Sequence, residues 1–193
     1  MSQLDVPWRD WSSDGFLHRV CKESGSGSVV FNVYEPKALA GPQPCDPDKT
    51  VDLAHGATVN DVAGRLSDLP EFTAVDGPAA RPAFWVEAIH LRIHSDSLRC
   101  EPTASSNQYQ LAANLGQDGF LMNTDLLPAV PSGEPTPSPG HRVVIDFWIV
   151  DLDGQNIVVE ARQEGTPTAT TVTQLDQVRR SVRFVSEERA ARN

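Results

Sequence analysis

The most regular group of residues that could do chemistry is a row of two histidines and an arginine, His90, Arg92 and His94. They alternate with three aliphatic residues, and this period of two predicts a strand with one apolar face and one wet face. Residues four apart on a strand are about 13 Å apart, so His90 and His94 cannot share one metal ion. The row predicts a solvated face. The alternative to a solvated face is a site for an anion or carboxylate, built on Arg92 and flanked by the two histidines.

Two acidic residues, Asp146 and Glu160, lie in apolar strand-like segments and could form a carboxylate pair for acid and base catalysis. The segments are joined by an Asp-Gly turn, a strong hairpin signal, which would place Asp146 opposite Ala161 and Glu160 opposite Phe147. The two carboxylates would then face opposite sides of the sheet and could not cooperate. We expect each to pair instead with an arginine of the same hairpin, Arg142 or Arg162.

Metal and cofactor motifs are missing from the sequence. Asp151, Asp153 and Asn156 have the oxygen spacing of a calcium loop, but the other ligands are absent, so a hairpin turn is the better interpretation. The cysteine spacing matches no compact zinc motif. The sequence contains no nucleophile elbow, phosphate loop, dinucleotide fingerprint or H-E-x-x-H. It therefore assigns no catalytic residue, no metal and no cofactor.

The three cysteines are Cys21, Cys45 and Cys100. Cys45 lies in a proline-rich turn and Cys100 just after a predicted strand, and at such loop positions a disulfide does not disturb a sheet. We favour a Cys45–Cys100 disulfide, which would contribute about 2–4 kcal/mol in an oxidising compartment. Cys21 would then remain a free thiol, buried as a small hydrophobic residue.

The elements that must position these groups are mostly strands, which predict an α+β fold with an antiparallel sheet of about six to eight strands flanked by helices. The sheet should contain a hairpin of 15–20 with 28–34, strands at 84–93 and 108–112, a central hairpin at 142–162 and a short strand at 183–185. Thr58 and Thr168 should cap two amphipathic helices, the first ending before Pro70. The tryptophans are expected in the core rather than along a ligand groove, namely Trp8, Trp11, Trp85 and Trp148.

The length and charge of the chain limit the classes of protein to which it can belong. The 193 residues suit a single domain spanning 1–193, with a proline-rich loop at about 128–140 and a flexible tail at about 187–193. A net charge of −10 would repel a phosphate backbone, so nucleic acid is excluded as a partner. The sequence contains no apolar run of about 18 residues and no signal peptide at its start. The chain is then either cytoplasmic or an ectodomain whose membrane anchor precedes it.

Two stretches resemble a recurring actinobacterial extracytoplasmic domain of unknown function. One runs from Val33 to Pro47 and on through Gly56–Val62, and the other runs from Phe147 to Ala161 and on to Ser181–Phe184. The order strand, strand, capped helix and strand also resembles the PsbP-like fold of photosystem extrinsic proteins and mycobacterial lipoproteins, an α/β/α sandwich. This resemblance implies a protein that binds or scaffolds partners, and a cysteine after the middle strand, like Cys100, supports the disulfide and an oxidising compartment. It implies no catalytic residues.

These observations predict a sensor-like, non-catalytic binding module on the extracytoplasmic side of the membrane. It would recognise a small molecule, a cell-envelope component or a protein. The alternative is an enzyme of unfamiliar type, for example a hydrolase that brings histidine and aspartate together from separate strands. A pocket that holds His90 or His94 within hydrogen-bond reach of a carboxylate would favour the enzyme, whereas solvated histidines would count against it.

Overall fold

The computed structural model describes residues 9–13, 16–23, 27–36, 38–39, 51–70, 72–98, 141–152, 154–182 and 184. For strands β1 (Arg9–Ser13) and β2 (Phe16–Glu23) it describes the backbone. Several expectations therefore lie outside the described residues: the Cys45–Cys100 disulfide, the strand at 108–112, the loop at 128–140 and the tail at 187–193.

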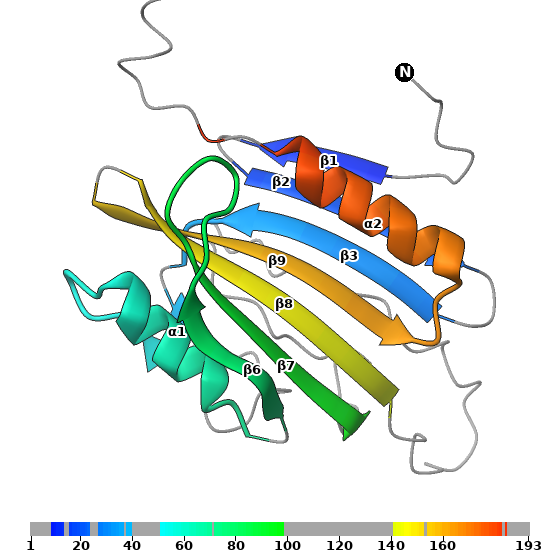
Figure 1. Ribbon diagram of the computed structural model, residues 1–193, viewed down its shortest axis with the longest axis horizontal. Coiled ribbons are helices and arrows are strands. Elements are labelled where there is room, and N and C mark those ends of the chain that lie inside the picture. The colour runs from blue at the N-terminus through cyan, green and yellow to red at the C-terminus, as the bar shows by residue number, and fades with distance from the viewer. Residues whose placement is uncertain are drawn as a thin grey trace, which may run out of the picture.

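The strands form one antiparallel sheet in the order β1-β2-β3-β9-β8-β7-β6 (Figure 1). The predicted hairpin of the first segments is confirmed, because β2 pairs antiparallel with β3. The predicted α+β class, an antiparallel sheet with helices, is also confirmed. The other bounds are β3 (Gly27–Tyr34), β6 (Thr73–Ala80), β7 (Ile89–Leu98), β8 (His141–Leu152) and β9 (Gln155–Gly165), with a separate short pair of β4 (Ala38–Leu39) and β5 (Val51–Asp52).

The hairpin of β8 and β9 lies in the middle of the sheet, as its two apolar faces predict. Its register is the predicted one, with Asp146 opposite Ala161 and Phe147 opposite Glu160. At the turn, Gly154 has a φ of 85°, which glycine adopts without steric cost, and its N–H donates to the Asp151 carboxylate at 2.7 Å. Asp151 thus shapes the hairpin turn, the role expected from the sequence.

Both helices begin at the predicted caps. In α1 (Val59–Ser67) the Thr58 hydroxyl accepts from the Asp61 N–H while the Asp61 carboxylate accepts from the Thr58 N–H, which completes a capping box. In α2 (Ala169–Ser181) the Thr168 hydroxyl accepts from the Thr171 N–H. Within the described ranges, no helix is long and apolar enough to span a bilayer.

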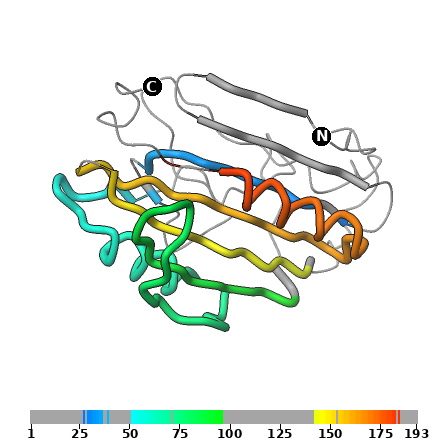
Figure 2. Tube along the Cα trace, turned by 45° about the horizontal axis from the view of Figure 1, so that its top comes forward, coloured from blue at the N-terminus to red at the C-terminus, as the bar shows by residue number. Residues whose placement is uncertain are grey.

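The two helices cover opposite faces of the sheet (Figures 1 and 2). The apolar side of α1 packs with one set of alternating residues from β7 and β8, including Leu91 and Phe147. The apolar side of α2 packs with residues on the other face of the sheet, including Phe31 of β3 and Val159 of β9. Because successive residues of a strand face opposite sides, each central strand contributes to both cores.

The segment before β7 differs from the prediction, since the strand expected at 84–93 begins only at Ile89. Ala83 and Val86 bond to each other through both N–H groups, which closes a two-residue turn at Phe84 and Trp85. Their φ angles are 54° and 67°. This is the pattern of a type I′ turn, which usually contains Asn and Gly, and a left-handed conformation costs a bulky residue about 1–2 kcal/mol.

Packing of Phe84 holds this turn in place. Phe84 is buried and meets the rings of Trp148 and Phe184 edge to face, with centroids 5.8 and 5.7 Å away. The Phe184 N–H also donates to the Phe84 carbonyl. Phe184 itself is not in a strand, so the short strand predicted around it is wrong at this residue. Figure 2 shows the segment between β6 and β7 close to the C-terminal end of α2.

The edge strand β6 is irregular. Its pairing with β7 shifts twice, between Ala74 and Asp76 and again between Asp76 and Ala79, and it contains Pro78. Most of its residues are exposed, with Val75 at 60%. Such shifts are β-bulges or similar interruptions, which bend a strand and break its ladder of hydrogen bonds.

Candidate functional site

Three side chains from β7 and β8 meet on the face of the sheet that carries α2. Arg92 lies directly opposite Asp146 in the strand register, and its Nε and Nη2 donate to Oδ2 of Asp146 at 3.1 and 2.7 Å. Nε2 of His90 lies 2.9 Å from Oδ1 of the same carboxylate. Asp146 therefore holds an arginine and a histidine of the neighbouring strand at once.

The Asp146 carboxylate is kept ionised by these partners. Burial acts to raise its pKa, but the hydrogen bonds from His90 and Arg92 and their charges outweigh this effect and hold the pKa below the usual value. The His90 side chain is buried, whereas 44% of the Arg92 side chain is exposed. The group thus has an inner His–Asp pair and an outer guanidinium at the surface.

The cluster continues to the sheet edge. Oδ2 of Asp76, on β6, lies 3.8 Å from Nδ1 of His90 and 2.8 Å from Nη2 of Arg81. Asp76 and Arg81 are each about half exposed. His90 is therefore enclosed between two carboxylates, and the outer one carries its own surface arginine.

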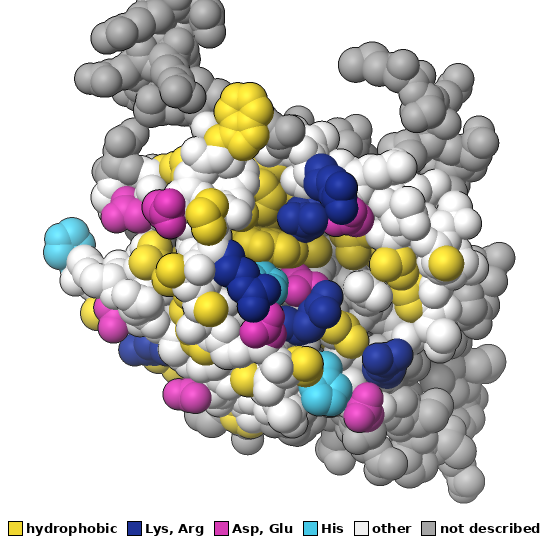
Figure 3. All heavy atoms as spheres, viewed as in Figure 1, with side chains coloured by type: hydrophobic (Ala, Val, Ile, Leu, Met, Phe, Trp, Pro, Cys, Tyr) yellow, Lys and Arg dark blue, Asp and Glu magenta, His cyan; other side chains and the backbone are white. Residues whose placement is uncertain are grey.

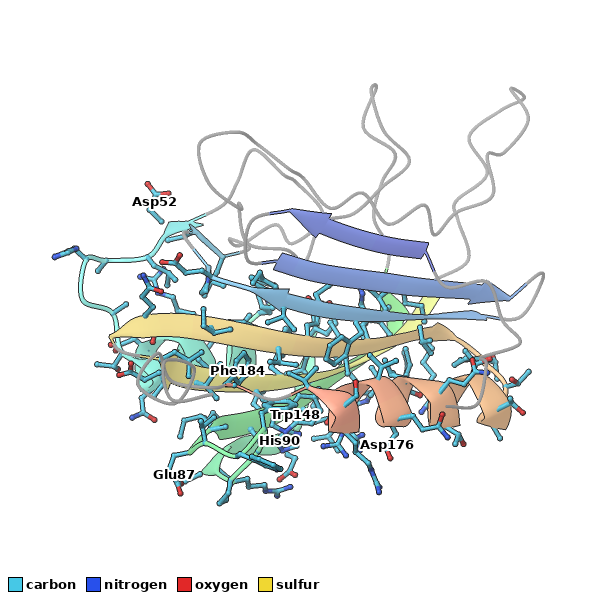
Figure 4. The ribbon with its side chains drawn as sticks, turned by 90° about the horizontal axis from the view of Figure 1, so that it is seen from above. Asp52, Glu87, His90, Trp148, Asp176 and Phe184 are labelled. Carbon is cyan, nitrogen blue, oxygen red and sulfur yellow. The ribbon has the colours of Figure 1, made fainter. Side chains whose placement is uncertain are left out.

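The cluster also continues to α2 through an aromatic ring. The Trp148 ring lies 5.0 Å from that of His90, and the Arg179 guanidinium lies over the Trp148 ring at 5.3 Å, a cation–π contact. Asp176 accepts from Arg179 at 2.6 Å and pairs with Arg180 at 2.7 Å. Figure 4, the view from above, places His90, Trp148 and Phe184 on the side of the sheet that carries α2, with Asp176 on the helix.

These contacts form one continuous network from the sheet edge to α2, which we call the α2-side network. Figure 3 shows this face, where basic, acidic and histidine side chains gather over the middle of the sheet beside hydrophobic surface. Its members are Asp76, Arg81, His90, Arg92, Asp146, Trp148, Asp176, Arg179 and Arg180.

The predicted row of His90, Arg92 and His94 is only partly brought together. His90 is buried, so the expectation of a wet face is wrong at this position, because Trp148 and the carboxylates cover the ring. Arg92 is exposed as expected. His94 lies apart from the network, with Nδ1 3.3 Å from the Thr73 carbonyl and Nε2 3.6 Å from Asp96.

A second polar cluster is buried on the opposite face of the sheet. Nε of Arg162 lies 3.3 Å from Oε1 of Glu160 and 3.0 Å from Oε1 of Glu164, and all three side chains are almost fully buried. The prediction that Glu160 pairs with Arg162 is confirmed. The same prediction for Asp146 is wrong, because Arg92 of the next strand is its partner.

Tyr34 lies beside this second cluster. Burial, followed by the negative charge of Glu160, raises the pKa of the Tyr34 phenol well above its usual value. Asn32 donates to Oε2 of Glu160 at 3.3 Å. These groups lie inside the core, so we assign them a structural role.

A groove of about 480 Å³ beside α1 is the other candidate. Its charged lining residues are Asp61, Arg65 and Asp68, and His55 also lines it. Asp61 is already engaged in the capping box, and its hydrogen bonds to Thr58 lower its pKa. In the part of the chain that the structure describes, no three His, Cys, Asp or Glu side chains are placed to hold a metal ion.

Chemically, the α2-side network offers paired donors and acceptors at a surface. Asp146, Asp76 and Trp148 were not identified as partners of His90 from the sequence. Asp146 and Trp148 are two residues apart on one strand and therefore share a face, which is the one sequence signal that linked them.

Comparison of the chain with family models, curated proteins and solved structures finds no match.

Proposed function

We propose that this chain is a non-catalytic binding module and that the α2-side network is its binding surface. The observation that carries the proposal is the continuity of the network, in which arginine and aspartate side chains from four elements are fixed by one another. Each pair leaves part of its donors and acceptors at the surface, as with Arg92 and Asp76. Fixed polar groups of this kind recognise a ligand with little loss of side-chain entropy.

The surroundings of His90 support binding rather than catalysis. A general base must reach a substrate proton through a nitrogen that is open to the substrate. Nε2 of His90 is engaged by Asp146, Nδ1 is buried and faces Asp76, and one side of the ring lies against Trp148. The imidazole is therefore held as a part of the scaffold, and it positions both carboxylates.

The binding surface can be tested by NMR titration of the full chain with acetate, inorganic phosphate and glucose. We expect these fragments to shift the Nε–H signals of Arg92, Arg179 and Arg180. Arg65 and Arg142 lie outside the network and are the internal controls. Equal shifts at all five arginines, or shifts only at the controls, would contradict the proposed surface.

We place the module outside the cytoplasm, as the ectodomain of a membrane-anchored or secreted protein with a PsbP-like fold. Support comes from the resemblance of its strand and cysteine pattern and from the helices on opposite faces of the sheet. The ligand classes that fit this location are a small molecule, a cell-envelope component and a protein.

A hydrolase is the second candidate, and the contact of 2.9 Å between His90 and Asp146 favours it. The two residues come from separate strands, as that alternative requires. Hydrolysis of p-nitrophenyl acetate tests it, with His90→Gln as the variant and His55→Gln as the control on an exposed histidine. A rate that falls for the first variant alone would support the enzyme, and equal rates would support the binding module.

A further inference from the structure

Trp85 is the most exposed large hydrophobic residue in the described part of the chain, with 75% of its surface accessible. It lies at the tip of a short hairpin that Arg81 closes by donating its N–H to the Ala88 carbonyl at 2.9 Å. Figure 4 shows Glu87, on this hairpin, on the same side of the sheet as α2 and projecting away from it. The hairpin that carries Trp85 is therefore on the same side of the sheet as the α2-side network, where its residue Phe84 packs on Trp148.

Burial of the Trp85 side chain contributes little to the hydrophobic core. Its φ is positive, which strains a side chain of this size, and its exposure means that little apolar surface is removed from water. Phe84, by contrast, is buried against Trp148 and anchors the turn. Strain of this kind, held in place by packing, is characteristic of functional positions.

The side chains around the base of the hairpin include both acidic and basic groups. Arg81 and Asp76 pair at the surface, and Asp76 reaches His90 of the network. The half-exposed carboxylates can accept hydrogen bonds, and the half-exposed guanidinium groups can donate them. A surface that combines these pairs with the indole at the tip of the hairpin offers an apolar plane and both kinds of hydrogen bond.

Resting on the binding role proposed above, we infer that the Trp85 turn and the α2-side network form a site for a carbohydrate chain. A pyranose has an apolar C–H face that stacks on an indole, and its hydroxyls both donate and accept. Among the described residues, the outer side chains of the network are about half exposed, so the site lies at the surface, which suits several sugar units in a row better than one small molecule.

The charges favour a glycan over other polymers. The network contains four arginines and three aspartates, so its charges nearly balance. Single anions can pair with one arginine, but an acidic peptide would also meet Asp76 and Asp176, which are each about 41% exposed. A nucleic acid would meet the same two aspartates along its phosphate backbone, and the net charge of −10 also disfavours it. Sugar hydroxyls, in contrast, donate to carboxylates and accept from guanidinium groups.

The test is titration of the full chain with cellohexaose, maltohexaose and chitohexaose, followed by calorimetry and tryptophan fluorescence. We expect at least one hexasaccharide to bind, and Trp85→Asn to weaken that binding by about tenfold or more. Asn adopts positive φ readily, so this variant keeps the turn. Val75→Asn, which changes an exposed residue of β6, is the matched control and should bind as the parent protein does.

Several results would overturn the inference. They are no binding of any hexasaccharide, equal binding by the parent and the Trp85→Asn variant, or tighter binding of polyglutamate or an oligothymidylate. If the small fragments still shift the network arginines while no hexasaccharide binds, the carbohydrate inference fails and the proposed binding surface stands. If neither probe acts on the network, both fail.

Discussion

Oδ1 of Asp146 lies 2.9 Å from Nε2 of His90, and both side chains are buried on the face of the sheet next to α2. The same carboxylate binds Arg92 through its other oxygen. An ionised carboxylate of this kind is stable inside a sheet only because two cationic or hydrogen-bonding partners satisfy it. The stability of this part of the sheet therefore depends on the charge of Asp146.

Replacement of Asp146 with Asn should lower the free energy of unfolding by about 2 kcal/mol, because Arg92 and His90 lose a charged acceptor. Urea denaturation at pH 7 measures the change. Asp96→Asn is the control, since this carboxylate is 74% exposed and its ion pairs are 3.6 Å or longer. That variant should change stability by less than about 0.5 kcal/mol. Equal losses in both variants would contradict the role of Asp146.

The contribution of Asp146 should depend on pH in a defined direction. Its folded-state pKa lies below the unfolded value of about 3.9, so its stabilisation is fully present above that pH and is lost as the pH falls through the folded pKa. The stability difference between the parent and the Asp146→Asn variant should shrink below about pH 4. Urea unfolding from pH 7 to 2.5 tests this, and a constant difference would exclude it.

Removal of the buried guanidinium of Arg162 should lower the free energy of unfolding more than the Asp146→Asn substitution does. Arg162→Leu leaves Glu160 and Glu164 together in the core without their cation, a change that typically costs about 3–5 kcal/mol. Arg142→Leu removes a mostly exposed arginine of the adjacent strand and should cost less than about 1 kcal/mol. Thermal unfolding followed by circular dichroism compares the two variants, and similar midpoints would refute the assignment.

Loss of the capping box of α1 should lower the free energy of unfolding moderately. Thr58→Ala removes the hydroxyl that accepts from the Asp61 N–H and should destabilise the protein by about 1 kcal/mol. Thr170→Ala changes an exposed residue in the first turn of α2, where alanine is the better helix former, and should cause no loss. Urea midpoints of the two variants decide between a local cap and a general effect of losing a threonine.

The expected disulfide can be tested by counting thiols on the denatured protein before and after reduction. One reactive thiol before reduction and three after would support the Cys45–Cys100 pair and a free Cys21, and a peptide map would identify the pair. Three thiols at the outset, in protein produced under oxidising conditions, would exclude the disulfide and weaken the extracytoplasmic placement.

Local signals explain which parts of the fold could be predicted. The Asp-Gly turn fixed the register of β8 against β9 to the residue, because a short hairpin leaves no freedom in the pairing. Thr58 and Thr168 located the helix starts, because a cap satisfies N–H groups within three residues of itself.

The pairing of β7 with β8 could not be predicted in the same way. The two strands are separated by more than 40 residues of sequence, so no tight turn sets their register. The placement of Asp146 opposite Arg92, and therefore the α2-side network, follows from that register. The type of each residue was visible in the sequence, but the contact was not.

The turn at Phe84 and Trp85 could not be predicted from the sequence for another reason. Two aromatic residues beside a valine favour a strand, and a turn with two positive φ angles usually contains Asn or Gly. Packing of Phe84 on Trp148 and Phe184 overrides this local preference. Such tertiary contacts lie far apart in the sequence and leave no local pattern.

The irregular strand β6 also affects how copies of the protein behave toward one another. A straight outer strand would expose a row of free N–H and C=O groups, on which a strand of another molecule could add and start aggregation. Pro78 has no N–H to offer, and the two shifts around Asp76 interrupt the spacing that an incoming strand would need. This side of the sheet is therefore protected against edge-to-edge association, and the face beside it can remain open to a ligand at high protein concentration.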